Sequence, residues 1–379
     1  MTLWQLATRK GDARLRGPRD GLPMVGLTGL MIAVTSAALV LVGPSQAWAR
    51  TTIKVCPTCT YTTIQGAISG ATPGDTIQIA SGTYTGPLSI NESLTLLGAG
   101  QGQTTITGSG PVYPITGSGP VVTITGSAVS VTITGVTITG GESSGYGGGI
   151  YNTGTVTLNN SAVSGNGASV GGGIYNTGTV TLNNSAVSGN STSAYGAGGG
   201  IYNDGTVTLN NSPVSSNGQG GIVNEGGKMT LNNTPVHGNG TCGHCVGGGI
   251  NNYDGGMVTL NKSPVSDNGA YGGGGINNSG TVTLNSSAVS GNGAYGGVGG
   301  GGINNSGTVT LNNSPVSGNT AANEGGGINN SGTVTLNKSP VSGNTASSEG
   351  GGINNAGTVT LNKSPVSGNT PDQCSPVLC

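Results

Sequence analysis

The chain has 379 residues, of which 78 are glycine and only 6% are charged, and its formal net charge is −1. High glycine content is typical of disordered or fibrous chains, but disorder goes with high charge and few β-branched residues. Here Val, Ile and Thr recur at fixed intervals. The composition therefore favours a repetitive β structure, and the lack of a basic stripe argues against a nucleic-acid partner.

Residues 1–49 have the pattern of a signal peptide. Basic residues from Arg9 onward precede an apolar run over residues 22–42, and Ala47–Ala49 fits a small-residue cleavage site. A retained membrane anchor is the alternative, because the run is long enough to span a bilayer. After cleavage the chain would begin at Arg50, with six basic and ten acidic residues and a formal charge of −4. We expect it to be secreted or at the cell surface, with no membrane segment.

Residues 50–140 are predicted to form an N-terminal cap and the first coils of a repetitive structure. Apolar residues between Ile64 and Ala71 follow the i, i+3, i+4, i+7 spacing of an amphipathic helix, which predicts a helix over residues 62–71. We interpret this helix as a plug over the first coil, whose backbone and core would otherwise face water. Strand-like stretches follow at residues 76–79, 93–97, 121–125 and 131–139.

Residues 141–370 contain nine copies of one unit, which reads Gly-Gly-Gly-Ile-x-Asn-x-Gly-Thr-Val-Thr-Leu-Asn-x-Ser-x-Val-Ser-Gly-Asn with small variations. Within it, residues 155–158 alternate polar and apolar as a strand does, and Ile150 and Val163 supply inward residues for two further strands. One coil cannot bury these side chains, but stacked coils can. The sequence predicts an all-β fold, a right-handed parallel β-helix of about a dozen coils with a short N-terminal capping helix and a tail over residues 371–379.

Three asparagine positions recur in all nine units, represented in the first unit by Asn152, Asn159 and Asn166. Asn tolerates left-handed backbone conformations, and stacked Asn side chains can bond along the solenoid. We therefore expect these residues to form the turns. Most of the variation in unit length falls between the closing Asn and the next glycine run, so one corner of the coil accepts insertions.

Two parts of the chain resemble known β-helix families. The stretches Thr63–Ile68, Pro73–Ile77 and Gly82–Tyr84 resemble the opening of the pectin methylesterase and pectate lyase type of right-handed β-helix. The pairs Gly147–Ile150 and Val163–Asn166 look like the repeats of bacterial polymorphic outer membrane proteins. The first resemblance implies a carbohydrate-active enzyme and the second implies adhesion.

The pectinase resemblance also implies a test for catalytic residues. Lyases of this kind use a basic residue, typically Arg, beside calcium-binding carboxylates, and the esterases use paired Asp with Arg and Gln. After Arg50 the chain has no Arg, and beyond its N-terminal portion the only Gln residues are Gln219 and Gln373. We therefore predict no catalytic residues and a non-catalytic adhesin, matrix or spacer module. A polysaccharide lyase or esterase of the pectinase-like fold is the alternative.

Two clusters could bind metal, although the fold requires no cofactor. Asp204, Glu225 and Asp254 occupy nearly equivalent turn positions in consecutive units, so they could form a column that holds Ca²⁺, or they could be scattered solubilising charge. A second group could bind Zn²⁺ and consists of His237, Cys242, His244 and Cys245. The alternative for this group is a disulfide with exposed histidines.

The six cysteines fall into three close pairs, and local disulfides are the default in an exported chain. We expect all three pairs to be oxidised. The pairs are Cys56 with Cys59, Cys242 with Cys245, and Cys374 with Cys379.

Exposed side chains offer two binding surfaces, whose partner would be an extracellular glycan or protein; the sequence does not indicate an oligomeric state. Tyrosines either recognise a partner or cover glycine-rich backbone. Those on one outward position are Tyr151, Tyr175 and Tyr202, and those in the insertion loops are Tyr146, Tyr195, Tyr271 and Tyr295. Thr-x-Thr pairs such as Thr155 and Thr157 form an array like that of ice-binding solenoids. Lys228 and Met257 interrupt its first column.

Overall fold

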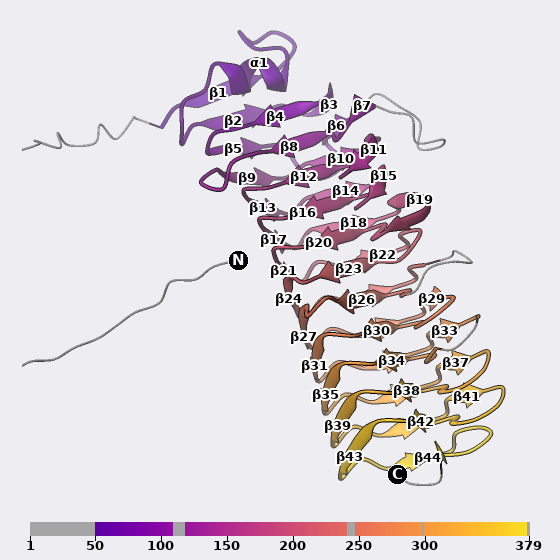
Figure 1. Ribbon diagram of the computed structural model, residues 1–379. Coiled ribbons are helices and arrows are strands. Elements are labelled where there is room, and N and C mark those ends of the chain that lie inside the picture. The colour runs from indigo at the N-terminus through magenta and orange to yellow at the C-terminus, as the bar shows by residue number, and fades with distance from the viewer. Residues whose placement is uncertain (1–49, 109–117, 241–246, 297–298, 377–379) are drawn as a thin grey trace, which may run out of the picture. The chain divides into compact units, whose positions relative to one another are not determined.

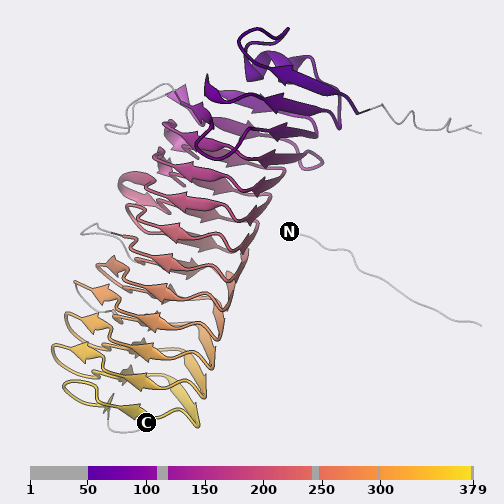
Figure 2. The same ribbon diagram turned by 180° about the vertical axis from the view of Figure 1, so that it is seen from behind.

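The computed structural model describes residues 50–108, 118–240, 247–296 and 299–376 (Figure 1). These residues form the predicted right-handed parallel β-helix, in which three long sheets of 13, 12 and 12 strands wind around one core. The view from behind shows the same regular stack of coils (Figure 2). Within the described residues, no helix has both the length and the apolar content needed to cross a membrane.

The most regular sheet, which we call the threonine sheet, receives one strand from every coil. Its strands alternate as predicted: Val156 and Leu158 are fully buried, whereas Thr155 and Thr157 face outward and are half-buried. Its strands are β1 (Thr52–Val55), β2 (Thr76–Ile79), β5 (Leu94–Leu97), β9 (Ser130–Thr134), β13 (Thr155–Asn159), β17 (Thr179–Asn183), β21 (Thr206–Asn210), β24 (Lys228–Asn232), β27 (Met257–Asn261), β31 (Thr281–Asn285), β35 (Thr308–Asn312), β39 (Thr333–Asn337) and β43 (Thr358–Asn362).

The second long sheet, the serine sheet, contains short strands, and each strand of the nine repeats points one Val inward. Pro213 and its equivalents precede these strands, where the missing N–H is tolerated and the carbonyl still accepts from Val187 of the previous coil. Its strands are β3 (Gly82–Thr85), β6 (Thr104–Thr107), β10 (Thr137–Thr139), β14 (Ala162–Ser164), β18 (Ala186–Ser188), β22 (Val214–Ser215), β25 (Val236–His237), β28 (Val265–Ser266), β32 (Val289–Ser290), β36 (Val316–Ser317), β40 (Val341–Ser342) and β44 (Val366–Ser367).

The third long sheet, the isoleucine sheet, carries the anchoring isoleucines of the repeats. Ile150 and its equivalents are fully buried, so the predicted inward columns of Ile, Val and Leu are confirmed. Its strands are β4 (Leu88–Ile90), β8 (Val122–Ile124), β12 (Ile150–Asn152), β16 (Ile174–Asn176), β20 (Ile201–Asn203), β23 (Ile222–Glu225), β26 (Ile250–Tyr253), β30 (Ile276–Asn278), β34 (Ile303–Asn305), β38 (Ile328–Asn330), β42 (Ile353–Asn355) and β45 (Cys374–Ser375).

The predicted N-terminal helix is α1 (Ile64–Ser69), which lies at the end of the solenoid beside β1 (Figure 1). Thr63 begins it, because its side chain accepts a hydrogen bond from the N–H of Gly66 at 3.2 Å. Ile64, Ala67 and Ile68 are buried in the core of the first coils. The helix therefore covers the apolar interior at this end, as a plug would.

Two details differ from the sequence-based prediction. The stretch 131–139 is two strands, β9 and β10, because Gly135 adopts a φ of +67° and turns the chain at a corner. The apolar alternation shifts by one position here, from Val131 and Ile133 to Val136 and Ile138, and the prediction of one strand overlooked this shift. At the corner that accepts insertions, the chain forms two further four-stranded sheets rather than loops. Their strands are β7 (Ser118–Gly119), β11 (Glu142–Tyr146), β15 (Gly167–Val170) and β19 (Ser191–Ala197), and then β29 (Gly269–Ala270), β33 (Gly293–Ala294), β37 (Thr320–Ala321) and β41 (Thr345–Ala346).

The recurrent asparagines form three ladders along the solenoid, two of them buried. Each Asn donates to the side-chain oxygen of an Asn in an adjacent coil: Asn152 to Asn176 at 2.7 Å and Asn166 to Asn190 at 2.9 Å. Although Asn tolerates left-handed backbone, none of the three ladder positions uses it: Asn152 and Asn159 end strands, and Asn166 has no positive φ. The left-handed residue is the one after Asn159, Asn160, with a φ of 48°. The ladder position is thus selected by side-chain bonding, not by backbone freedom.

Candidate functional site

A single file of threonines runs along the whole threonine sheet. Strand pairing places one Thr of each of the 13 strands in register with the next, at the roughly 4.8 Å spacing of neighbouring strands. The neighbouring outward column is interrupted by Lys228 and Met257, as expected. The threonine column consists of Thr52, Thr76, Thr95, Thr132, Thr157, Thr181, Thr208, Thr230, Thr259, Thr283, Thr310, Thr335 and Thr360.

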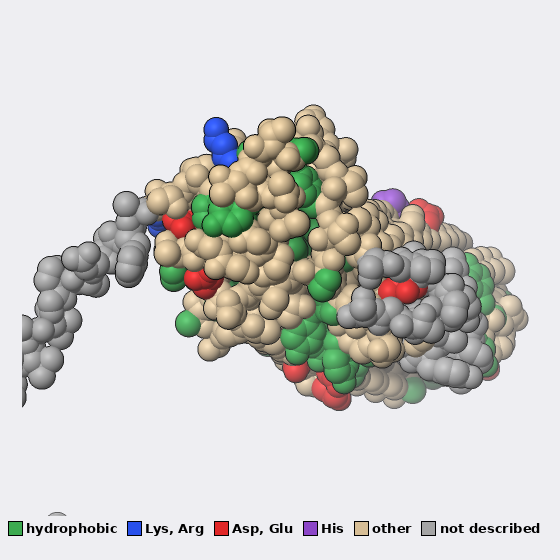
Figure 3. All heavy atoms as spheres, turned by 90° about the horizontal axis from the view of Figure 1, so that it is seen from above, with side chains coloured by type: hydrophobic (Ala, Val, Ile, Leu, Met, Phe, Trp, Pro, Cys, Tyr) green, Lys and Arg blue, Asp and Glu red, His purple; other side chains and the backbone are tan. Residues whose placement is uncertain are grey.

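The third asparagine ladder lies on the outside of the same sheet, beside the threonine column. Asn183 donates to Asn159 at 2.9 Å, and the same bond repeats coil by coil until Asn362 donates to Asn337 at 2.8 Å. These bonds fix the outward amides, and the β-branched threonines have few rotamers. The face is therefore a rigid, periodic array of hydroxyl, methyl and amide groups with few charges, such as Lys228. Seen from above, charged side chains are sparse on the surface (Figure 3).

The isoleucine sheet presents a short tyrosine stack. The rings of Tyr151 and Tyr175 are parallel with centroids 5.5 Å apart, and those of Tyr175 and Tyr202 are 5.2 Å apart. Tyr146 reaches across from β11 and tilts against Tyr175 at 4.6 Å. Because the rings cover one another's faces, the stack offers a partner mainly ring edges and hydroxyls. The side chain of Tyr195 lies outside the described residues.

Two of the tyrosines in the insertion loops cover glycine backbone. Tyr271 and Tyr295 are 52% and 74% exposed, yet both lie against glycine backbone. A Cβ added to Gly293 would lie 2.7 Å from the Tyr295 ring, and one added to Gly296 would lie 2.1 Å from the Tyr271 ring. These contacts favour covering the backbone as their main role.

The proposed carboxylate column is interrupted by a tyrosine. Asn203 pairs with Asn224 on the neighbouring strand, so the next residues, Asp204 and Glu225, lie side by side. On the following strand, however, the residue in register with Glu225 is Tyr253. Asp254 is displaced by one position, because this unit has extra residues in the turn. Burial of the Tyr253 side chain raises its pKa to about 12, with further contributions from the negative charge of Glu225 and from the hydrogen bond between the two side chains.

This arrangement does not fit Ca²⁺. Two carboxylates and a protonated phenol provide too few hard oxygen ligands. Within the described ranges, no three His, Cys, Asp or Glu side chains gather where they could hold a metal ion. Of the two alternatives for these residues, the strand register favours scattered charge over a calcium-binding column. Sequence reasoning missed Tyr253, although the two-residue insertion before Val258 was a signal that the register shifts there.

The proposed zinc ligands and two of the three disulfides fall partly outside the described residues. His237 is exposed at the end of β25, while Cys242, His244 and Cys245 lie in the undescribed segment 241–246. Cys56 and Cys59 form the expected disulfide. Cys374 is also disulfide-bonded, and its expected partner Cys379 lies outside the described residues, as does the predicted signal peptide.

Comparison with known proteins finds similarity at the level of the fold. The A-module of a mannuronan C-5 epimerase from Azotobacter vinelandii is 15% identical, with a TM-score of 0.48, covering 81% of this chain and 93% of that one. A pectin methylesterase from Aspergillus niger is 19% identical, with a TM-score of 0.42, covering 58% and 79%. An alginate lyase from Paenibacillus is 16% identical, with a TM-score of 0.45, covering 74% and 99%. No protein-family model and no curated protein sequence matches the chain.

Proposed function

We propose that this protein is a secreted or surface-exposed, non-catalytic β-helix module that binds a repeating extracellular partner, a glycan or a protein surface, and also acts as a spacer. The observation that carries the proposal is the register of identical outward side chains along the threonine sheet. A rigid array of equal, weak contacts binds a repeating partner by multivalency, without one strong site. The resemblance of the repeats to those of polymorphic outer membrane proteins supports the same role.

The chemistry of the outer columns favours binding over catalysis. Catalytic sites bring together titratable groups whose pKa values are shifted to suit the reaction. Along the threonine sheet the outward groups are mainly hydroxyls and amides, which donate and accept hydrogen bonds but do not titrate at neutral pH. The acidic patch at Asp204 and Glu225 holds Tyr253, whose raised pKa keeps it protonated. A protonated phenol is a weak general base.

The test is a binding screen paired with an activity assay. Residues 50–379 would be screened on arrays of glycans and matrix proteins, and incubated with polygalacturonate, methylated pectin and other acidic glycans with and without calcium. We expect binding to a repeating ligand and no turnover. Turnover that is lost in Asp204→Ala or Glu225→Ala would overturn the proposal in favour of a pectinase-like enzyme. Sequencing the exported protein from its N-terminus should give Arg50 as the first residue.

The unbroken threonine column supports ice as a second candidate partner. A flat row of hydroxyls and methyls at roughly 4.8 Å intervals is a template for ordered water, and Lys228 and Met257 interrupt only the column beside it. Thermal hysteresis measured on residues 50–379 would test this function. Activity that disappears in Thr283→Lys but persists in Ser266→Lys, on another face, would support it, and an inactive parent protein would exclude it.

A further inference from the structure

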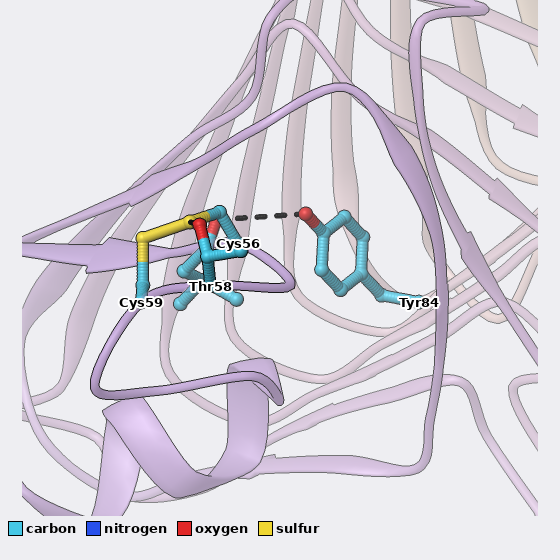
Figure 4. Close-up of a disulfide and its surroundings, with 5 residues drawn as sticks. Cys56, Thr58, Cys59 and Tyr84 are labelled. Atoms are coloured by element: carbon cyan, nitrogen blue, oxygen red, sulfur yellow. Dashed lines mark hydrogen bonds between the residues drawn. A yellow bond between two sulfur atoms is a disulfide. The ribbon is translucent and has the colours of Figure 1, made fainter.

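The first coil carries a disulfide that the fold does not need for its shape. Cys56 and Cys59 are linked across the turn that follows β1 (Figure 4). The same turn is already closed by backbone hydrogen bonds, from Cys56 N to Tyr61 O at 3.2 Å and from Cys59 N to Cys56 O at 3.1 Å. A cross-link over so few residues also removes little entropy from the unfolded chain. Opening this disulfide should therefore leave the solenoid folded.

The disulfide is accessible from two sides. Both cysteines are half-buried and line an open hollow of about 440 Å³, whose wall includes the apolar residues Val55 and Ile79. Cys59 also lines a second hollow of about 510 Å³ on the neighbouring surface. A peptide bearing a thiol can thus approach Cys59 from either hollow.

The pair has a hydroxyl beside Cys56 and a lysine nearby, both of which favour a thiolate once the disulfide opens. The Thr58 hydroxyl oxygen lies 3.6 Å from Cys56 Sγ (Figure 4). Lys54 lines both hollows, and none of the described residues around either hollow is acidic. A nearby cation lowers the pKa of a cysteine thiol, and a thiol of lower pKa leaves a disulfide faster. Because the Thr58 hydroxyl lies beside Cys56 while Cys59 lines both hollows, attack on Cys59 with Cys56 as leaving group is the favoured direction of exchange.

We propose that Cys56 and Cys59 form a redox-active disulfide that oxidises dithiols in partner proteins. A thiolate of the partner attacks Cys59 Sγ, the bond between the two sulfurs breaks, and Cys56 leaves as a thiolate. The partner's second thiolate then attacks the sulfur of its first cysteine in the mixed disulfide and releases Cys59. Two electrons and two protons pass to the chain, and the partner gains a disulfide. A low-molecular-weight disulfide regenerates the starting state by the reverse exchange.

The experiment places residues 50–379 in glutathione buffers of graded potential and maps reduced cysteines by alkylation and mass spectrometry. We expect Cys56 and Cys59 to become reduced while Cys374 stays oxidised, with an unchanged thermal unfolding curve. The oxidised protein should also transfer its disulfide to a synthetic peptide with two cysteines. Equal peptide oxidation by a Cys56→Ser/Cys59→Ser variant, or unfolding on reduction, would overturn the proposal.

The role of Lys54 provides a sharper control. Lys54→Gln should slow the transfer several-fold at neutral pH without changing the unfolding temperature, and Lys228→Gln, on an exposed strand position away from the pair, should leave the rate unchanged. A single-cysteine peptide should be trapped on Cys59 and not on Cys56. Trapping on Cys56 would contradict the assigned direction of attack, and equal rates for the two lysine variants would contradict the role of Lys54.

Discussion

At the scale of single residues, the buried asparagines stabilise the repeats through bonds that pass between coils. Asn292 is 1% exposed, and its oxygen accepts from both the backbone and the side-chain nitrogen of Asn268 at 3.0 Å. Its own amide donates to Val265 O and to Asn319 Oδ1. Every polar atom of this side chain is therefore satisfied inside the protein, where an unpaired group is costly.

Removing this side chain should destabilise the solenoid strongly. Asn292→Ala leaves buried donors of Asn268 without an acceptor, so we expect a loss of about 2 to 4 kcal/mol in the free energy of unfolding. The matched control is Asn285→Ala in the outward ladder, where water can replace the lost bonds and the loss should stay below about 1 kcal/mol. Urea unfolding measures both. Equal losses would show that the buried ladder is no more important than the outward one.

Three lysines occupy the left-handed position at which most coils have Asn. Lys262, Lys338 and Lys363 have φ values of 52°, 50° and 54°. This conformation costs a residue with a Cβ roughly 1 to 2 kcal/mol, and Asn tolerates it best. Lys338→Asn should therefore raise stability by about 0.5 to 1 kcal/mol. Lys228→Asn, in the extended strand β24, should give no gain, and a gain of the same size there would point to charge instead of backbone strain.

Asp75 makes the first coil sensitive to acid. It is 3% exposed, and its carboxylate accepts from the N–H groups of Thr51 and Thr72 at 2.7 and 2.8 Å. The bond from the Thr51 N–H, followed by that from Thr72, lowers the pKa of Asp75 to about 2. A group with a lowered folded pKa stabilises the protein above its unfolded pKa, and that stability is lost as the pH falls through the folded value.

The expected effect is a loss of stability between about pH 4 and pH 2. We expect about 1 to 2 kcal/mol, allowing for solvent screening near the surface of the first coil. Asp75→Asn should abolish this part of the pH dependence and be less stable at neutral pH. Asp267→Asn, at an exposed turn, is the control and should leave the acid transition unchanged. Urea unfolding midpoints measured across this pH range test the prediction. An unchanged acid transition in Asp75→Asn would contradict it.

At the scale of strands and corners, the glycine run before each isoleucine allows the chain to pack closely. A Cβ at Gly302 would lie 2.6 Å from Gly327 O and 2.9 Å from Asn319 Nδ2. Neither neighbour can withdraw, because the first belongs to the backbone of the next coil and the second is fixed in the buried ladder. This corner requires glycine for space, so its sequence stays constant where the neighbouring insertions vary.

Gly302→Ala should therefore lower the free energy of unfolding by about 1 to 3 kcal/mol through overpacking. Gly218→Ala is the control, because its Cβ would meet nothing closer than 3.5 Å and its φ is not left-handed. We expect the control to change stability by less than about 0.5 kcal/mol. Thermal unfolding by circular dichroism distinguishes the two, and similar shifts would indicate that loss of glycine flexibility, not space, is the cause.

The strands themselves could be predicted from the sequence because period-two alternation and the 21-to-28-residue repeat both act in every coil. The corners could not be predicted equally well. The corner at Gly135 is marked only by a one-residue shift in the apolar alternation. The short sheet containing β29 and β33 depends on Ala294 packing against Ala321 and Ala346. The candidate site was harder still. Either Asp254 or Tyr253 could align with Glu225, depending on which side of this position the extra residues of the unit lie. Only the pairing between strands shows that the aligned residue is Tyr253.

At the scale of the whole solenoid, each coil contacts mainly its neighbours, so whole coils can be removed without changing the rest. Residues 303–327 are one such unit: deleting them joins Gly302 to Ile328 and leaves the same side chains in register, with Asn329 beside Asn277 and Thr335 beside Thr283. Deleting residues 303–352 removes two coils in the same way. Both variants keep the N-terminal helix, the tyrosine stack and the end of the chain.

These deletions separate a multivalent surface from a single binding site. If the partner binds through the periodic columns, each lost coil removes one set of equal contacts, and the affinity should fall by a similar factor with each deletion. If it binds at the tyrosine stack or beside Cys56, which both variants retain, the affinity should not change. Titration of the parent protein and both variants against the ligand found on the arrays gives the two ratios. A constant affinity across the series would refute multivalent binding and restrict the site to the coils that both variants retain, before Ile303 or from Ile353 onward.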